Sequence, residues 1–234
     1  MKTLSIVTKE LKIYFNHPMS YIIAVIFLLM TGWFFSSSLF IVKLAEINSL
    51  LTILPFLLLF FIPAITMKTI AEEKRQGTIE LILTNPISDS SFIIGKYLSS
   101  MLIMCFLYLF TLIYPLMLSI AGDPDGGKIF VSYIGLLLLT SLYISIGIFA
   151  SSFTKNQIIS FIVAFMIIFI FFMLDKVTIF FPAQFQNILQ YLSTTYHFNN
   201  FTLGFIDMGD LTYYIAFTVL FLYLAYYKIT ERYY

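Results

Sequence analysis

Two stretches of the sequence carry residue types that enzymes use, and the first is the glycine-rich segment Gly122–Lys128. Its spacing matches a phosphate-binding loop, in which backbone amides hold phosphate and a serine or threonine after the lysine holds magnesium. Here Ile129 follows the lysine, and two acidic residues and a proline occupy positions that should hold phosphate. We therefore interpret the segment as a turn and expect no ATP-binding site in it.

The second stretch is the adjacent pair Glu72 and Glu73, which is typical of the acid/base residues of some intramembrane metalloproteases. A catalytic metal needs several protein ligands, and in such proteases histidines inside the spans supply them. The two histidines, His17 and His197, both lie outside the long apolar runs. We therefore expect no catalytic residue and no metal site. Because the predicted spans carry no ionisable residue in their interior, proton-coupled transport is also disfavoured.

The two glutamates belong to the longest charged segment of the chain, Met67–Lys96. Six of the 25 charged residues lie between Glu72 and Asp89, in a protein that is 60% hydrophobic and only 11% charged. Soluble domains carry about 25% charged residues, and the mean hydropathy here is +0.96. The composition predicts an all-α integral membrane protein in which this polar stretch can contact a soluble partner. The alternative is a solvated loop whose charges only set the topology.

The remaining composition excludes several classes of protein and partner. The net charge is +1, which gives no basis for nucleic-acid binding. The single cysteine, Cys105, lies in an apolar run, so no intramolecular disulfide is possible. The first apolar run begins near Pro18 and is too long for the apolar region of a secretory signal, so we expect it to remain as a signal anchor.

The apolar runs predict six transmembrane helices, each long enough to cross a hydrocarbon core of ~30 Å. They cover about residues 19–42, 50–70, 92–121, 129–153, 158–174 and 211–227. In the fourth span, small residues repeat four apart, which favours close packing of helix backbones. The small residues are Ser141, Ser145, Gly147 and Ser151.

The segment before the first span, residues 3–16, has apolar residues at helical spacing. Lys9, Glu10 and Lys12 fall on the other faces of this helix. The pattern predicts an amphipathic helix that lies in the membrane interface. A soluble N-terminal arm is the alternative.

The segment between the last two spans, residues 177–206, lacks charge and has the length of a further span. Between Gln184 and Thr202, however, it carries too many amide and hydroxyl groups to cross hydrocarbon. We expect one or two short re-entrant helices at the external membrane edge. Phe185 and Leu189 should lie on their shielded face.

Six spans place both termini on one side of the membrane, and the basic residues indicate which side. Ten lysine and arginine residues fall near the termini, in the charged stretch and in the turn at Lys155, whereas three fall in the opposite loops. The positive-inside rule therefore places both termini and the charged stretch in the cytoplasm.

Three motifs, in order along the chain, carry a resemblance to a known family: the charged stretch, the turn Ser151–Gln157 and the segment from His197 to Leu211. In the first, the matching residues are Glu73-Lys74-Arg75, Gly77-Thr78, Glu80-Leu81, Pro86-Ile87-Ser88 and Gly95-Lys96. Over nearly its whole length, the sequence resembles the ABC-2 type exporter permeases. It is most similar to the small permease subunit of the gliding-motility type, and copper and nitrous-oxide accessory permeases are more distant relatives.

The resemblance implies the fold and the partners of such a permease. Residues 1–234 would form a single transmembrane domain, with a coupling helix around Glu72–Glu80 and a connecting helix at residues 3–16. A dimer of permease chains, identical or paralogous, would lie in the cytoplasmic membrane, in contact with its lipids, and dock on two separate ATPase subunits. ATP hydrolysis would then drive export. This chain would bind no cofactor, because ATP and Mg²⁺ bind to the ATPase.

The resemblance also implies which residues act. Those expected to couple the chain to the ATPase are Glu72, Glu73, Lys74, Arg75, Gly77, Thr78, Glu80 and Lys155. The candidates in the external segment are Phe185, Leu189, His197 and Asn200. A glycine inside a helix costs about 1 kcal/mol relative to alanine, so we expect a helix end or a close backbone approach at Gly77.

The alternative functions are a stand-alone channel or secondary carrier, and a non-transporting membrane anchor.

Overall fold

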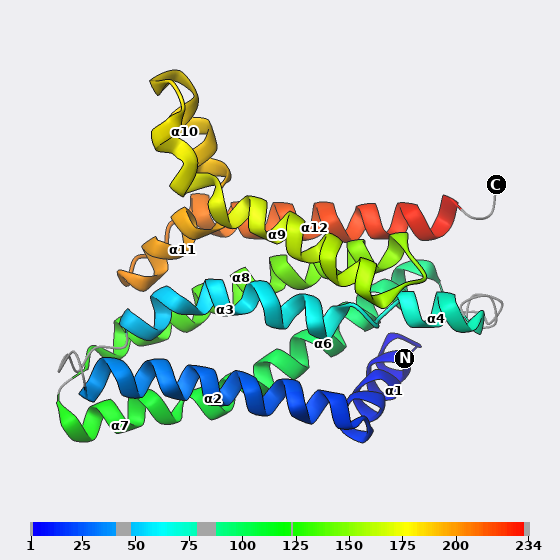
Figure 1. The fold of residues 1–234 in the computed structure, drawn as a ribbon, viewed down its shortest axis with the longest axis horizontal. Coiled ribbons are helices and arrows are strands. Elements are labelled where there is room, and N and C mark those ends of the chain that lie inside the picture. The colour runs from blue at the N-terminus through cyan, green and yellow to red at the C-terminus, as the bar shows by residue number, and fades with distance from the viewer. Residues whose placement is uncertain (1, 41–47, 79–87, 123, 232–234) are drawn as a thin grey trace.

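The computed structural model describes residues 2–40, 48–78, 88–122 and 124–231, and these residues form helices joined by short turns (Figure 1). The helices are α1 (Lys2–Asn16), α2 (Pro18–Phe40), α3 (Asn48–Thr66), α4 (Ala71–Gln76), α6 (Asp89–Thr111), α7 (Ile113–Ala121), α8 (Gly126–Phe153), α9 (Gln157–Val177), the 3₁₀ helix η1 (Thr178–Phe180), α10 (Ala183–Leu192), α11 (Thr194–Thr202) and α12 (Met208–Thr230). The described part contains no strand.

Six helical stretches of the described residues are long and apolar enough to cross a membrane, as the sequence predicts. They are Pro18–Leu39, Leu50–Gln76, Asp89–Ile120, Gly126–Phe153, Gln157–Phe180 and Met208–Thr230. The chain is therefore an all-α multi-pass membrane protein.

Helix α8 is the centre of the bundle and packs against α3, α6, α9, α11 and α12. Its small residues allow this, as the sequence predicts. A Cβ atom at Gly147 would overlap the Thr66 side chain of α3, and one at Gly135 would overlap the Phe201 ring of α11. The backbones therefore approach so closely that both positions exclude any larger side chain.

The predicted third span, about residues 92–121, is confirmed by the stretch Asp89–Ile120, within which the turn residue Leu112 separates α6 from α7. Pro115 has no backbone N–H, so the carbonyl of Thr111, four residues earlier, loses its helical donor. The Tyr133 hydroxyl of α8 donates to that carbonyl at 3.1 Å. The break is thus stabilised by a neighbouring helix, as proline sites inside spans require.

Helix α1 lies across the end of the bundle rather than along it (Figure 1) and packs mainly on α6. The contact is close, because a Cβ at Gly95 would lie 2.8 Å from Ile6 Cγ2. The helix ends at Asn16, before His17-Pro18, as proline geometry favours. The predicted amphipathic helix is confirmed, but Glu10 lies on the packed face and is 6% exposed, not on a polar face as expected.

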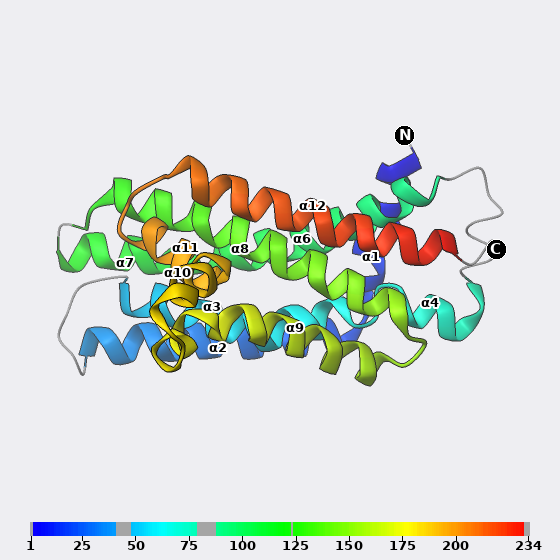
Figure 2. The ribbon, with the colours of Figure 1, turned by 90° about the horizontal axis from the view of Figure 1, so that it is seen from above.

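The start of α1 and the end of α12 lie at the same end of the bundle as α4 (Figures 1 and 2). The α7–α8 turn and α11 lie at the opposite end, where α10 projects from the bundle (Figure 1). The short helices α10 and α11 occur where re-entrant helices were predicted, and no further span interrupts them. The six-span order of the sequence prediction is therefore confirmed.

Candidate functional site

The short helix α4 follows α3 after a hydrogen-bonded turn, and the end of α8 holds it in place. Ser151 Oγ accepts hydrogen bonds from the backbone amides of Ile70 and Ala71, each at 3.0 Å. It also donates to the Met67 carbonyl at 3.3 Å. A single hydroxyl of α8 thereby satisfies the first free amides of α4, which lacks a capping side chain of its own.

Gly77 ends α4 in the left-handed conformation, with φ of 70°. Its N–H donates to the Glu73 carbonyl, as in helix ends capped by glycine. The predicted helix end is confirmed. The coupling helix was expected over Glu72–Glu80. Helix α4 covers the first part of that range and ends at Gln76, and Glu80 lies outside the described residues. Thr78 follows, and its Oγ1 donates to the Glu73 carbonyl at 3.4 Å.

Lys74 faces the bundle instead of the solvent. Its side chain is 4% exposed, and its ammonium donates to the backbone carbonyl of Ser152, near the end of α8. Together with Ser151, this contact fixes α4 to α8 at two points. Lys74 is therefore a structural link between the two helices.

Glu73 also faces inward, into a buried ion cluster with Lys96 of α6 and Glu10 of α1. Lys96 Nζ lies 3.0 Å from Glu10 Oε1 and 2.9 Å from Glu73 Oε2. It donates a hydrogen bond to Glu10, whereas its contact with Glu73 is an ion pair whose geometry does not meet that of a hydrogen bond. The exposed fractions of the Lys96, Glu10 and Glu73 side chains are 1%, 7% and 12%. Buried charges are tolerated only when paired, so this cluster joins α1, α4 and α6 into one unit.

The remaining charges at this end are more exposed. Arg75 Nη2 lies 2.6 Å from Glu72 Oε1, with 62% of the arginine side chain exposed. Lys9 Nζ lies 3.4 Å from Glu73 Oε1, with 52% of its side chain exposed. Lys155, in the turn between α8 and α9, is exposed and lines one hollow with Arg75. The structure thus brings together all described residues of the predicted coupling set.

A half-open cavity of about 710 Å³ lies between α1 and α4, lined by Lys9, Glu10, Tyr14, Glu72, Glu73 and Lys96 among others. The Tyr14 hydroxyl donates to the Ile65 carbonyl near the end of α3. Burial raises the pKa of Tyr14 above its ordinary value, and the charge of Glu10 adds to the effect. Tyr14 therefore remains a hydrogen-bond donor, and it ties α1 to α3.

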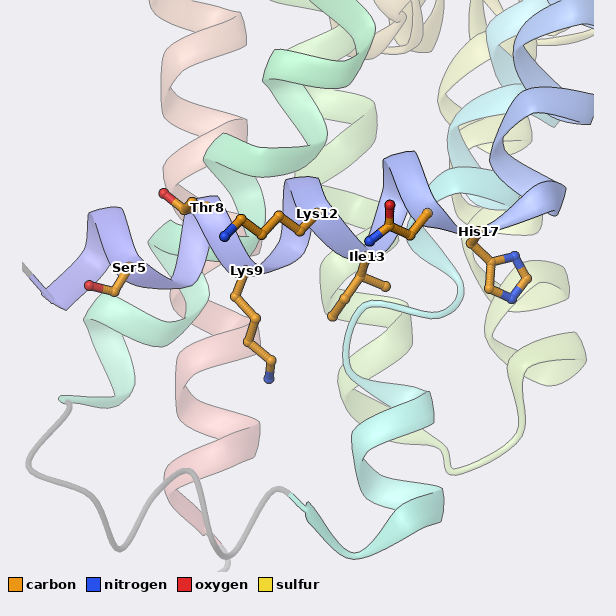
Figure 3. Close-up of a pocket in the computed structure, with 7 residues that line it drawn as sticks. Ser5, Thr8, Lys9, Lys12, Ile13 and His17 are labelled. Carbon is orange, nitrogen blue, oxygen red and sulfur yellow. The ribbon is translucent and has the colours of Figure 1, made fainter.

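A second hollow, of about 800 Å³, follows the outer face of α1 (Figure 3). Its lining residues are Ser5, Thr8, Lys9, Lys12, Ile13, Asn16 and His17. In Figure 3, Lys9 and Ile13 project from α1 on the side on which α4 lies. Ile13 is 49% exposed among these lysines.

At the opposite end, His197 of α11 is the centre of a second buried cluster. Its Nδ1 lies 2.5 Å from Asp210 Oδ1 of α12, and its Nε2 lies 2.8 Å from the Tyr191 carbonyl of α10. Asn200 Nδ2 donates to the other Asp210 oxygen at 2.9 Å. The Tyr213 ring stacks on the imidazole, with the ring centres 4.0 Å apart. Two of the predicted external residues, His197 and Asn200, therefore meet on one carboxylate.

Hydroxyl groups attach the same segment to the spans. Tyr213 donates to the Leu192 carbonyl at 2.7 Å, and Tyr214 to the Thr194 carbonyl at 2.8 Å. Phe185 and Leu189 lie apart from this cluster, on α10. Phe185 is 53% exposed, so the protein itself does not shield it, and the predicted shielding requires lipid or another chain.

Sequence reasoning missed three residues that organise these sites: Glu10, Ser151 as the partner of α4, and Asp210 as the partner of His197. Glu10 and Ser151 lie far along the chain from their partners, and Asp210 lies on the helix after that of His197. One signal was present for the first cluster, because Lys96 is a single lysine at the start of a long apolar run. Such a lysine needs a nearby carboxylate.

Within the described residues, no three histidine, cysteine, aspartate or glutamate side chains gather closely enough to hold a metal ion. Nearly the whole chain, residues 4–230, matches the family described as ABC-2 family transporter protein. No curated protein matches the sequence. The six spans, the polar helix after the second span and the extent of this match agree, and the chain belongs to the ABC-2 family of transporter proteins.

Proposed function

We propose that this chain is the membrane-spanning permease subunit of an ATP-driven exporter. Separate ATPase subunits dock on α1, α4 and the α8–α9 turn, and their ATP hydrolysis drives export of a substrate across the cytoplasmic membrane. The observation that carries the proposal is the attachment of α4 to α8 through Ser151 and Lys74. A polar helix that only set the topology would not need such links to the core.

The attachments offer a path for mechanical coupling. A force on α4 reaches α8 through Ser151 and Lys74, and reaches α1 and α6 through Lys96. Helix α8 has 28 residues, which corresponds to about 42 Å at 1.5 Å per residue. At its other end, Ser132 Oγ donates to the Phe201 carbonyl of α11 at 3.1 Å. One rigid helix thus connects the docking surface with the external cluster.

The proposal includes the assembly and the orientation. Both termini and α4 face the cytoplasm, in accordance with the distribution of lysine and arginine. The permease works as a dimer with a second chain, identical or paralogous. ATP and Mg²⁺ bind to the ATPase subunits and not to this chain. The likeness to the gliding-motility type of permease rests on the sequence motifs alone.

The test is to purify the affinity-tagged permease, identify the ATPase subunit that accompanies it, and reconstitute both in lipid nanodiscs. We expect the permease to stimulate ATP hydrolysis. With Cys105 replaced by serine and a cysteine at Gln190, trapping the ATPase with vanadate should change the rate of thiol labelling on α10. The control is an ATPase variant that binds ATP without hydrolysing it.

The two alternative functions predict other results. A stand-alone channel or carrier would transport in liposomes without ATP. A membrane anchor would bind the ATPase, but neither hydrolysis nor the labelling of α10 would respond. Either result would refute the proposed function.

A further inference from the structure

The most exposed charges at the α1 and α4 end of the bundle are cations, although Lys74 and Lys96 are buried there. The carboxylates of Glu10 and Glu73 point inward and are 7% and 12% exposed. The cations of Lys9 and Arg75 point outward and are 52% and 62% exposed. A partner that approaches this end therefore meets mainly positive charge.

The cations lie along one continuous surface, which three adjoining hollows define. The hollow along α1 and the cavity between α1 and α4 share Lys9 as a lining residue. The cavity and the hollow at the α8–α9 turn share Arg75 and Gln157. Lys12 lines the first hollow, Lys68 the cavity and Lys155 the third hollow.

The positive charge of this surface is only partly neutralised from within, by the pairs of Lys9 with Glu73 and of Arg75 with Glu72. Lys12, Lys68 and Lys155 form no ion pair with any carboxylate in the described part of the chain, whereas Lys96 is paired with both Glu10 and Glu73. Glu72 is already paired with Arg75. The surface therefore keeps a net excess of cations around the half-exposed Ile13.

We propose, on the basis of the proposed function, that the ATPase subunit docks on this surface through an acidic patch of its own. The carboxylates of Glu10 and Glu73 are internal scaffolding and do not contact it. Complementary charges of this kind orient a partner and speed its association. The partner in turn covers Ile13.

The position of the cations favours a protein partner over anionic lipid headgroups. Phe15 of α1 packs against Phe106 of the span α6, with ring centres 5.6 Å apart, and both rings stay partly exposed, which marks this flank of α1 as the apolar one. Lys9 projects instead on the side of α4 (Figure 3). Arg75 and Lys155 lie at helix ends, where the bundle meets the cytoplasm.

The experiment measures binding of the purified ATPase subunit to the permease in nanodiscs of neutral phosphatidylcholine, at several salt concentrations. The variants are Lys12→Glu and Lys155→Glu, singly and together, because neither lysine forms an ion pair in the described structure. An exposed charge pair contributes about 0.2–1 kcal/mol, and reversal adds repulsion. We therefore expect the double variant to bind about tenfold more weakly, with a shallower dependence on salt.

The matched control is Lys176→Glu, because Lys176 is an exposed lysine at the opposite end of the bundle. Its reversal should leave the affinity unchanged. Lys12→Gln with Lys155→Gln provides a milder second pair, which should weaken binding less than reversal does. The variants of Lys12 and Lys155 should retain the thermal stability of the native permease, since they lie outside the buried clusters. Lys176→Glu also removes the contact of Nζ with the Phe172 ring at 3.8 Å, so its affinity is compared at a temperature well below its measured Tm.

Two results would overturn the acidic docking patch. In the first, the double reversal leaves the affinity and its salt dependence unchanged although the native permease binds the ATPase. In the second, reversal matters only in nanodiscs that contain phosphatidylglycerol, which would assign the cations to lipid headgroups. If the native permease binds no ATPase at all, the proposed function fails instead, so the two failures are distinguishable.

Discussion

At the scale of single residues, Lys96 is the side chain on which the α1 and α4 end depends most. It neutralises two buried carboxylates from two other helices. Lys96→Met would leave Glu10 unpaired in a buried site and Glu73 with only the exposed Lys9 as its partner, and breaking a buried ion pair costs about 3–5 kcal/mol. We expect a clear fall in Tm, measured by thermal unfolding of the purified permease in detergent.

The charge explanation has its own control. Adding Glu10→Gln and Glu73→Gln to Lys96→Met removes the uncompensated carboxylates and should restore most of the lost Tm. If the triple variant is no more stable than Lys96→Met alone, then packing of the lysine chain, and not its charge, holds the three helices together.

His197 shows the same dependence at the other end, through hydrogen bonds. Both ring nitrogens face acceptors, the Asp210 carboxylate and the Tyr191 carbonyl, and Asp210 also accepts from Asn200. His197 and Asn200 face different oxygens of Asp210. In Asp210→Asn, an NH2 group replaces one of these oxygens, which leaves one buried donor without its acceptor at a cost of about 1–3 kcal/mol. We expect faster hydrogen exchange in α10 and α11.

Asp207→Asn is the matched control for this prediction. Asp207 caps α12 by accepting from Gly209 N at 3.1 Å, and it is exposed. Asparagine is an equally good capping residue, so exchange in α10 and α11 should stay unchanged. Equal effects of the two substitutions would show that charge at this end, and not the His197 cluster, holds the external helices.

At the scale of elements, the contact of α8 with α3 depends on the absence of a side chain at Gly147. The Cβ atom in Gly147→Ala would overlap Thr66, which α3 cannot move without separating from α8. Overpacking of this kind costs about 1–3 kcal/mol. We expect a lower Tm and weaker stimulation of the ATPase by the permease.

Gly126→Ala in the first turn of the same helix is the control, because a Cβ there has no atom within 4 Å. It should leave both the Tm and the stimulation as they are. A Gly147→Ala variant that behaves like Gly126→Ala would show that α3 and α8 have room to move apart, and the proposed rigid path through α8 would then be wrong.

At the scale of the whole molecule, hydropathy was sufficient to predict the six spans, because an apolar run of span length has few other stable environments. Local rules also predicted the end of α1 before Pro18 and the end of α4 at Gly77. The break at Leu112 was missed although Pro115 marks it. The effect of a proline on a span depends on a partner such as Tyr133, which only the packed structure supplies.

The candidate sites were predictable only in part, since each depends on how separate helices pack together. The spacing of the apolar residues of α1 assigned Glu10 to another face, and its burial depends on which face of α1 meets Gly95. The pairing of His197 with Asp210 requires α11 to fold back on α12. No local pattern encodes either contact.

The orientation of the molecule in the membrane is the last prediction, and it can be tested on intact cells. The structure places Gly126 and Asn199 at one end of the bundle and Gln76 at the other, and all three are exposed. In a Cys105→Ser background, cysteines at Gly126 and at Asn199 should react with an impermeant thiol reagent, because the positive-inside rule places them outside. A cysteine at Gln76 should react only after the cells are permeabilised. Six spans allow two orientations. If only the cysteine at position 76 were labelled in intact cells, the molecule would have the opposite orientation, and α4 would face away from any cytoplasmic ATPase.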